Sequence, residues 1–201
     1  MIGGIGRDTS RRFWRLVGSK TQLVGTVKIL VVAVALCVTA LPAASETPYN
    51  LGVAAWQKKN YVEAARQWSA AVLTGNLDAM NNLAYLYSNG LGVAHQDAVA
   101  LSLWQSAAYS GHSESQWHLG TVYEQGLGVS ADLVRAYAWY GCALASAKRN
   151  TEGETADVET KIGADAESSL AALKEKLDDK QLARAEVLRA QLVERYGKAA
   201  P

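Results

Sequence analysis

Cysteine is scarce in this sequence, which contains only Cys37 and Cys142 among its 201 residues. Cys37 lies in an N-terminal segment with the pattern of a cleaved leader, so the remaining chain has one thiol and cannot form an internal disulfide. In an oxidising compartment a lone thiol is usually tolerated only when it is buried. We therefore predict that Cys142 is a core residue rather than a reactive thiol.

Motifs of catalysis and metal binding are also missing. After residue 45 there is no Gly-x-Ser-x-Gly elbow, no Ser-x-x-Lys pair, no Walker loop and no His-Glu-x-x-His. His112 and His118 are six residues apart, which does not place both on one helical face, and His95 falls in a predicted turn. We therefore predict a non-enzymatic protein with no catalytic residues, no cofactor and no metal.

The first 45 residues have the order of a secretory signal peptide, in which basic residues precede a short apolar run that ends in small residues. We expect cleavage after Ser45, or alternatively after Ala43, and a soluble periplasmic product. The apolar run is ILVVAVALCVTAL, and the basic residues before it are Arg7, Arg11, Arg12, Arg15, Lys20 and Lys28.

Alternatives remain open for this leader. Residues 23–44 are nearly long enough to span a bilayer, so an uncleaved anchor is possible, although Lys28 interrupts the segment. The stretch SRRFWR resembles a twin-arginine signal, but Trp14 and Arg15 depart from that pattern, so the export route is either this one or the general secretory one. Leu36 before Cys37 argues against lipid attachment.

Clustered cations are absent from the rest of the chain. Six of the twenty basic residues and one of the nineteen acidic residues precede Glu46, which leaves fourteen basic and eighteen acidic residues. Phosphate backbones require clustered positive charge. We therefore expect no nucleic-acid partner, and contact with a membrane only through the leader if it is not cleaved.

A repeat of thirty-six residues runs through the middle of the chain. Gly-Leu-Gly-Val occurs at residues 90–93 and again at 126–129, and the same shift aligns further positions. A fixed period in this range indicates stacked supersecondary units. A third, degenerate unit precedes them, because Ala64, Trp68 and Ala71 lie thirty-six residues before Ala100, Trp104 and Ala107.

Each unit has the pattern of two helices joined by a glycine turn. Apolar residues recur at helical spacing on both sides of the Gly-Leu-Gly-Val stretch. Gly90 and Gly126 can adopt the positive φ that ends a helix and reverses the chain. Small residues such as Ala84 and Gly120 let paired helices approach, and one large aromatic residue per unit fills the space between layers.

The C-terminal tail predicts a lid for the open end of the stack. Leucines recur at helical spacing from Val158 onward, and Asp178 with Gln181 forms a capping box before a last helix. The polar stretch KRNTEGETAD before it predicts a mobile link. The predicted organisation is thus a signal peptide at 1–45, a solenoid at 46–149, and a polar link with capping helices at 150–201.

The repeat resembles the Sel-1-like repeat, a relative of the tetratricopeptide repeat. The segments WHLGTVYEQGLGVSADLVRAYAWYGCA and NNLAYLYSNGLGVAHQDAVALSLWQSAAYSG carry this similarity, which covers about Tyr49–Lys148 and is weakest in the first unit. The resemblance implies an all-α, right-handed α-solenoid of about three antiparallel helix pairs with a C-terminal capping helix pair. It also implies a protein-binding scaffold, whose partner would be another protein of the cell envelope. The alternative is a small-ligand binder or weak hydrolase acting on cell-wall fragments.

The stacked first helices of such a solenoid line a concave groove. Leu83, Ala84 and Tyr87 form the packing stripe of the second unit, so the opposite stripe is predicted to face the groove. The same position in the third unit follows from the shift of thirty-six residues, and Tyr49, Asn50 and Val53 take it in the first unit. The predicted partner-binding residues are Asn81, Asn82, Tyr85, Trp117, His118, Thr121 and Glu124, with Trp117 as the anchor. The alternative for Trp117 is that it folds onto a neighbouring repeat as a core residue.

Overall fold

The computed structural model describes residues 46–150 and 155–197, and every regular element in these ranges is an α-helix. Glu46–Pro201 form one compact unit. The predicted signal peptide lies outside the described residues, and so do positions 151–154 of the predicted link. No helix within the described ranges combines the length and the apolar character needed to cross a bilayer.

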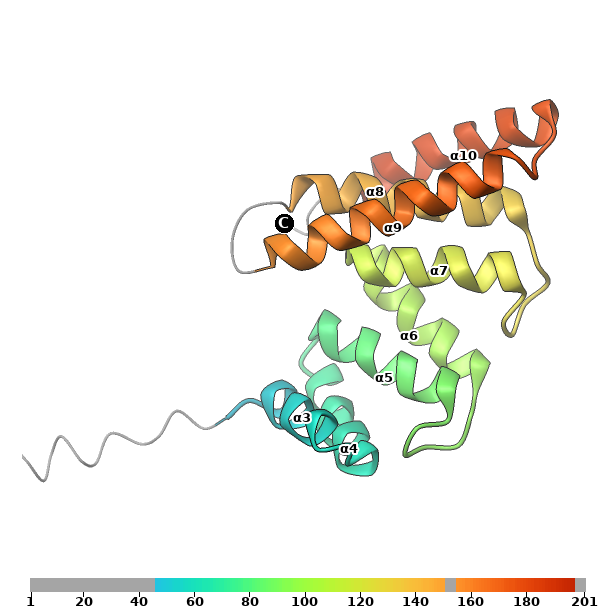
Figure 1. Cartoon of the computed structure of the whole chain (residues 1–201). Helices are drawn as coiled ribbons and strands as arrows, with labels where there is room; N and C mark the ends of the chain where they lie inside the picture. Colours follow the sequence, from blue (N-terminus) through green and yellow to red (C-terminus); the bar gives the residue numbers. More distant parts are fainter. Residues whose placement is uncertain (1–45, 151–154, 198–201) are drawn as a thin grey trace, which may run out of the picture. The chain divides into compact units, whose positions relative to one another are not determined.

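Eight helices follow one another in the described residues, and they pair as the repeat predicts (Figure 1). α3 packs on α4, α5 on α6 and α7 on α8, while contacts between α4 and α5 and between α6 and α7 stack the pairs. The all-α solenoid of three helix pairs with a terminal pair is therefore confirmed. The helices are α3 (Pro48–Gln57), α4 (Tyr61–Val72), α5 (Leu77–Asn89), α6 (Asp97–Tyr109), α7 (Ser113–Gln125), α8 (Leu133–Arg149), α9 (Ala156–Lys174) and α10 (Asp179–Tyr196).

Small residues on the first helix of a pair make room for an aromatic ring of the second. A Cβ atom on Gly52 would overlap the ring of Trp68, and one on Gly120 would overlap the ring of Tyr140. In the middle pair the buried Ala84 lies in one cluster with Trp104. The predicted alternation of small and large residues is therefore what lets each pair close.

The repeated glycine turn is built as predicted. Gly90 and Gly126 end α5 and α7 in the left-handed region, with φ of 62° and 76°. In both turns the chain then returns to the tyrosine two residues before the helix end. The Gln96 N–H donates to the Tyr87 carbonyl at 3.0 Å, and the Asp132 N–H donates to the Tyr123 carbonyl at 2.7 Å.

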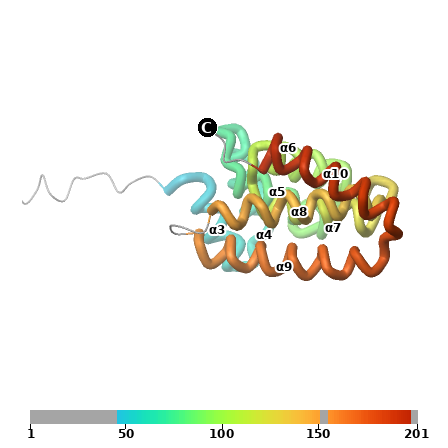
Figure 2. The backbone as a smooth tube through the Cα atoms, turned by 90° about the horizontal axis from the view of Figure 1, so that it is seen from above, coloured from blue at the N-terminus to red at the C-terminus, as the bar shows by residue number. Residues whose placement is uncertain are grey.

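The two C-terminal helices cover the end of the stack. α9 and α10 lie on opposite sides of α8 (Figure 2), and both pack against it. The predicted capping box is present, because Asp178 accepts from the Gln181 N–H at 2.8 Å and the Gln181 side chain accepts from the Asp178 N–H at 3.0 Å. α9 also reaches back to contact α7.

Cys142 lies in the core of α8, as its lone occurrence predicted. Its side chain is fully buried, and burial raises the pKa of the thiol to about 12. The Sγ atom lies 3.5 Å from the Leu192 carbonyl of α10. The thiol is therefore protonated at neutral pH and serves helix packing.

Candidate functional site

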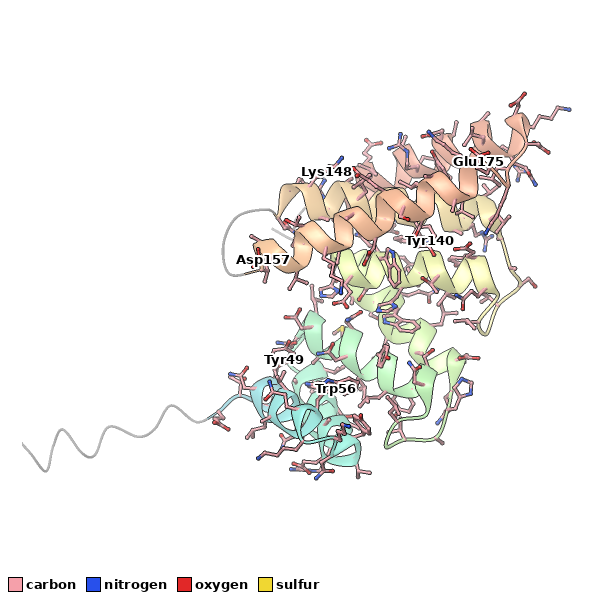
Figure 3. The ribbon with its side chains drawn as sticks, viewed as in Figure 1. Tyr49, Trp56, Tyr140, Lys148, Asp157 and Glu175 are labelled. Carbon is pink, nitrogen blue, oxygen red and sulfur yellow. The ribbon has the colours of Figure 1, made fainter. Side chains whose placement is uncertain are left out.

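A hollow of about 360 Å³ opens on the row of first helices, between α3, α5 and the first turns of α7. Figure 3 labels two of the residues that line it, Tyr49 and Trp56, both on α3. One lining residue, Trp68, comes from α4 instead. The lining residues are Tyr49, Val53, Trp56, Trp68, Asn81, Asn82, Tyr85, Glu114 and His118.

Aromatic rings form one wall of this hollow. The Trp56 ring lies 5.9 Å from that of Trp68 and 5.8 Å from that of Tyr85, measured between ring centroids. The contact with Tyr85 is edge-on, at an interplanar angle of 77°. Because Tyr85 is also 39% exposed, this wall offers apolar contact area to a molecule that enters from solvent.

A hydrogen-bonded network beneath the hollow joins α5 to α7. His112 Nε2 lies 3.1 Å from Asp78 Oδ1, and His112 Nδ1 lies 2.9 Å from Ser115 Oγ. Ser115 Oγ in turn donates to Asn81 Oδ1 at 3.1 Å. The chain of contacts fixes Asn81, which is 2% exposed, at the bottom of the hollow.

The order Asp78, His112, Ser115 has the residue types of a hydrolase triad, but the geometry is that of a helix cap. His112 Nδ1 accepts from the Ser115 backbone N–H at 3.1 Å, because His112 is the N-cap residue of α7. The Ser115 hydroxyl is fully buried, and its proton points to Asn81. A nucleophile needs both a free base and access to substrate. Ser115 has neither in this arrangement.

Glu114 and His118, which both line the hollow, have shifted pKa values. Burial raises the pKa of Glu114 above its ordinary value. Burial, with a smaller contribution from the charge on His112, lowers the pKa of His118 to about 4. The His118 ring stacks on Trp104 with centroids 4.6 Å apart. At neutral pH His118 is therefore an uncharged imidazole.

Metal binding finds no support in the same region. Among the residues that the structure describes, no three His, Cys, Asp or Glu side chains gather in a way that could hold an ion.

Comparison with protein families matches two of the helix pairs to a known repeat. The Sel1 repeat model matches residues 77–112 and 113–146, which are the pairs α5–α6 and α7–α8. The chain contains two Sel1 repeats. The pair α3–α4 falls outside the match, in line with its degenerate sequence. A comparison with curated proteins found no match.

Solved structures with the same repeat fold resemble the described unit. A crystal structure of c5321, a protective antigen of uropathogenic Escherichia coli strains that displays an SLR fold, is 27% identical, with a TM-score of 0.63. The match covers 75% of this chain and 30% of that one, so this chain spans less than a third of its length. A Sel1 repeat protein from Oxalobacter formigenes is 21% identical over 73% of this chain and 69% of its own, with a TM-score of 0.49.

Four of the seven predicted binding residues lie together in the hollow. Asn81, Asn82 and Tyr85 come from the first Sel1 repeat, and His118 comes from the second. One correction applies to this group. Asn81 was predicted to face solvent, but it is buried, because Ser115 of the next repeat covers and binds it.

The other three predicted residues also lie on α7, but they are outside the hollow lining and contact α8, α9 or the turn that follows α9. Trp117 packs with a cluster that contains Tyr140 and Leu173, and its indole N–H is buried without a hydrogen bond. The Thr121 hydroxyl lies 3.2 Å from that of Tyr140. Glu124 accepts from Lys176 Nζ at 2.9 Å. This stripe is only partly open to solvent, since α9 contacts α7, and a role of these three residues in partner binding stays a prediction.

Sequence reasoning missed two residues of the hollow that it could have found. Trp56 lies thirty-two residues before Ser88, so the shift that placed Tyr49 and Val53 also places Trp56 on the groove stripe. Glu114 lies one helical turn before His118 on the same face of α7. Extending the stripe by one turn at each end would have included both.

Proposed function

We propose that this protein is a non-enzymatic interaction module of the cell envelope, and that a partner protein binds at the hollow on its row of first helices. Sel1 repeats generally mediate protein–protein interaction, and proteins of this fold are generally non-catalytic scaffolds. The observation that carries the proposal is the aromatic wall of the hollow, where the partly exposed Tyr85 lies against Trp56.

The composition of the hollow supports a protein partner. Interface hot spots are rich in Trp and Tyr, which provide contact area at a low cost in conformational entropy. The hollow combines such rings with the amides of Asn81 and Asn82, and an amide can bind a backbone N–H or C=O group. A solenoid also presents these groups along several helices, which suits an extended segment of a partner.

The proposed location is the periplasm, and the sequence of residues 1–45 supports it through its basic start, apolar run and small residues. The partner is then another protein of the envelope. A mature chain with more acidic than basic residues fits a partner segment of opposite charge better than it fits nucleic acid.

Capture from envelope extracts tests this proposal. Tagged mature protein is compared with Tyr85→Ala and with a matched control, Tyr109→Ala, which removes an exposed tyrosine of α6 outside the hollow. We expect a specific protein to be retained by the parent and by the control, and to be lost by at least about tenfold with Tyr85→Ala. Equal retention by both variants contradicts the proposed site.

A second candidate function is the binding of a small ligand such as a cell-wall fragment. The volume of about 360 Å³, lined in part by the half-buried Glu114 and His118, falls in the range typical of small-molecule pockets, about 300 to 1,000 Å³. Thermal melting with purified muropeptides tests it. A rise in the melting temperature that is absent from the Tyr85→Ala variant favours this function over a protein partner.

A further inference from the structure

The charge around the hollow is mainly negative. Glu114 is its only charged lining residue, and none of the nine lining residues is a lysine or an arginine. Burial is the main cause of the raised pKa values of Tyr49 and Glu114. The negative charge of the nearby Asp78 raises both pKa values further. The region therefore has negative charge with no lining cation to balance it.

The elements packed around Glu114 do not remove this imbalance. His112 is the N-cap residue of the same helix, but it is already hydrogen-bonded to Asp78. From α9, the acid Glu159 and the base Lys161 both act on Glu114, with opposite sign. Acids in the first turn of a helix are common because they stabilise its N-terminus. Glu114 differs from such a residue because its side chain lines a cavity and is partly dehydrated there.

His118 provides an independent indication of a ligand. It is half-buried, burial lowers its pKa so that it is uncharged at neutral pH, it lines the hollow, and no hydrogen bond joins its ring to any of the described residues. A neutral imidazole has one nitrogen that accepts a hydrogen bond. The hollow therefore contains an acceptor for which the described residues supply no donor.

The aromatic residues complete a site for a flat cation. Tyr49, Trp56 and Tyr85 surround the same space, and a cation over such a ring gains electrostatic attraction. Guanidinium is planar, stacks on aromatic rings, and donates through several N–H groups in a fixed plane, which an ammonium group cannot match.

We infer that the hollow binds the side chain of an arginine residue on the partner protein, with Glu114 as its counter-ion and His118 as an uncharged acceptor. This inference rests on the proposed function and makes it more specific. Glu114 carboxylate oxygens suit paired N–H donors, and the partly exposed Tyr85 opens the hollow to solvent at one edge.

Capped amino acids test the inference directly on the mature protein. The probes are the N-acetyl, N-methylamide derivatives of arginine, lysine and citrulline, the last being the uncharged isostere of arginine. Binding is followed by NMR shifts of the Trp56 indole and the His118 ring. We expect saturable binding of the arginine probe, at least about tenfold weaker binding of citrulline, and an intermediate affinity for lysine. Equal binding of arginine and citrulline overturns the inference.

Matched variants assign the effect to the named residues. Glu114→Gln keeps the size of the side chain and is expected to weaken arginine binding at least about tenfold, whereas Glu175→Gln, an exposed acid far along the chain, is expected to leave it unchanged. His118→Phe keeps an aromatic ring but removes the acceptor, and a loss of several-fold is expected. Unchanged binding by a folded Glu114→Gln variant, checked by circular dichroism, overturns the inference.

The outcomes also separate this inference from the proposed function. If partner capture depends on Tyr85 but the arginine probe does not bind, the arginine inference fails and the interaction site stands. If the probe binds but the Tyr85→Ala variant captures the partner fully, the proposed site fails. A dimer that dissociates on addition of the probe makes the occupant a second copy of this chain, and overturns the assignment to another protein.

Discussion

Gly92 lies directly against the backbone of Tyr61, so that a Cβ atom at position 92 would overlap the Tyr61 carbonyl group. The contact joins the turn of one helix pair to the start of α4 in the pair before it. Gly128 repeats the relationship in the next unit, where a Cβ atom would lie 3.0 Å from that of Asp97. The second glycine of each turn is thus a stacking contact between units, as well as a flexible position.

Substitution of Gly92 is therefore expected to lower the free energy of unfolding by more than its positive φ alone explains. Gly75 is the matched control, because it also has positive φ, 80° against 68°, but an added Cβ there meets nothing within 4 Å. We expect Gly75→Ala to lower the free energy of unfolding by about 1 kcal/mol, and Gly92→Ala by at least about 2 kcal/mol more. Urea denaturation of both variants measures this difference. Equal costs contradict the stacking role.

The buried His118 predicts a dependence of stability on pH. Its pKa is about 4 in the folded protein, against about 6.5 in an unfolded chain. Between these values the unfolded chain binds a proton that the folded protein does not, so the free energy of unfolding rises with pH across this window. The full effect is on the order of 3 kcal/mol, present above pH 6.5 and lost as the pH falls toward 4.

Comparison with the His118→Phe variant isolates this contribution from that of Glu114. The pKa of Glu114 is raised, so over a neighbouring pH range its titration changes the free energy of unfolding in the opposite direction. Phenylalanine can keep the stacking on Trp104 but binds no proton. Denaturation at pH 4.5 and pH 7 should show a smaller loss for the variant than for the parent. Equal losses mean that His118 is hydrated in the folded protein.

Trp117 and Tyr85 are expected to respond in opposite ways to truncation. Trp117 packs beside Tyr140 with ring centroids 6.2 Å apart, within the cluster closed by α9. Trp117→Ala should therefore lower the free energy of unfolding by about 2 to 4 kcal/mol, whereas Tyr85→Ala should change it by less than about 1 kcal/mol, because its ring is partly exposed. Thermal melting of the two variants tests this, and a stable Trp117→Ala variant returns Trp117 to the binding surface.

The repeat made most of the fold predictable from sequence, because identical constraints recur at a fixed spacing. Gly90 and Gly126 indicated the turns, and Asp178 with Gln181 indicated the start of α10. The covered part of the groove was not predictable in the same way. The apolar pattern of α9 shows which of its faces is buried, but not that it contacts α7 as well as α8.

The candidate site was predictable where one helix determines a residue's direction. Asn82 and Tyr85 follow from the period of α5, and both line the hollow. Asn81 does not, because its burial depends on Ser115, thirty-four residues away in the next unit. Contacts between units decide such positions, and a pattern within one helix has no information on them.

Export predicts a defined N-terminus for the mature protein. Mass spectrometry of protein recovered from a periplasmic fraction should give a chain that begins at Glu46, or at Ala44 if cleavage follows Ala43. Recovery of a membrane-bound form that retains residues 1–40 establishes an anchor instead. Loss of export on replacing both Arg11 and Arg12 by lysine indicates the twin-arginine route.

Photo-crosslinking in living cells tests the central claim most directly. A benzoylphenylalanine residue replaces Tyr85 in the hollow or, as the control, Tyr109, an exposed tyrosine of α6. The interaction proposed here predicts that irradiation joins position 85 to one discrete envelope protein, identified by mass spectrometry, and that Trp56→Ala reduces this product. Crosslinks from position 109 but not from position 85 would contradict the account, because they place the partner on the second helices.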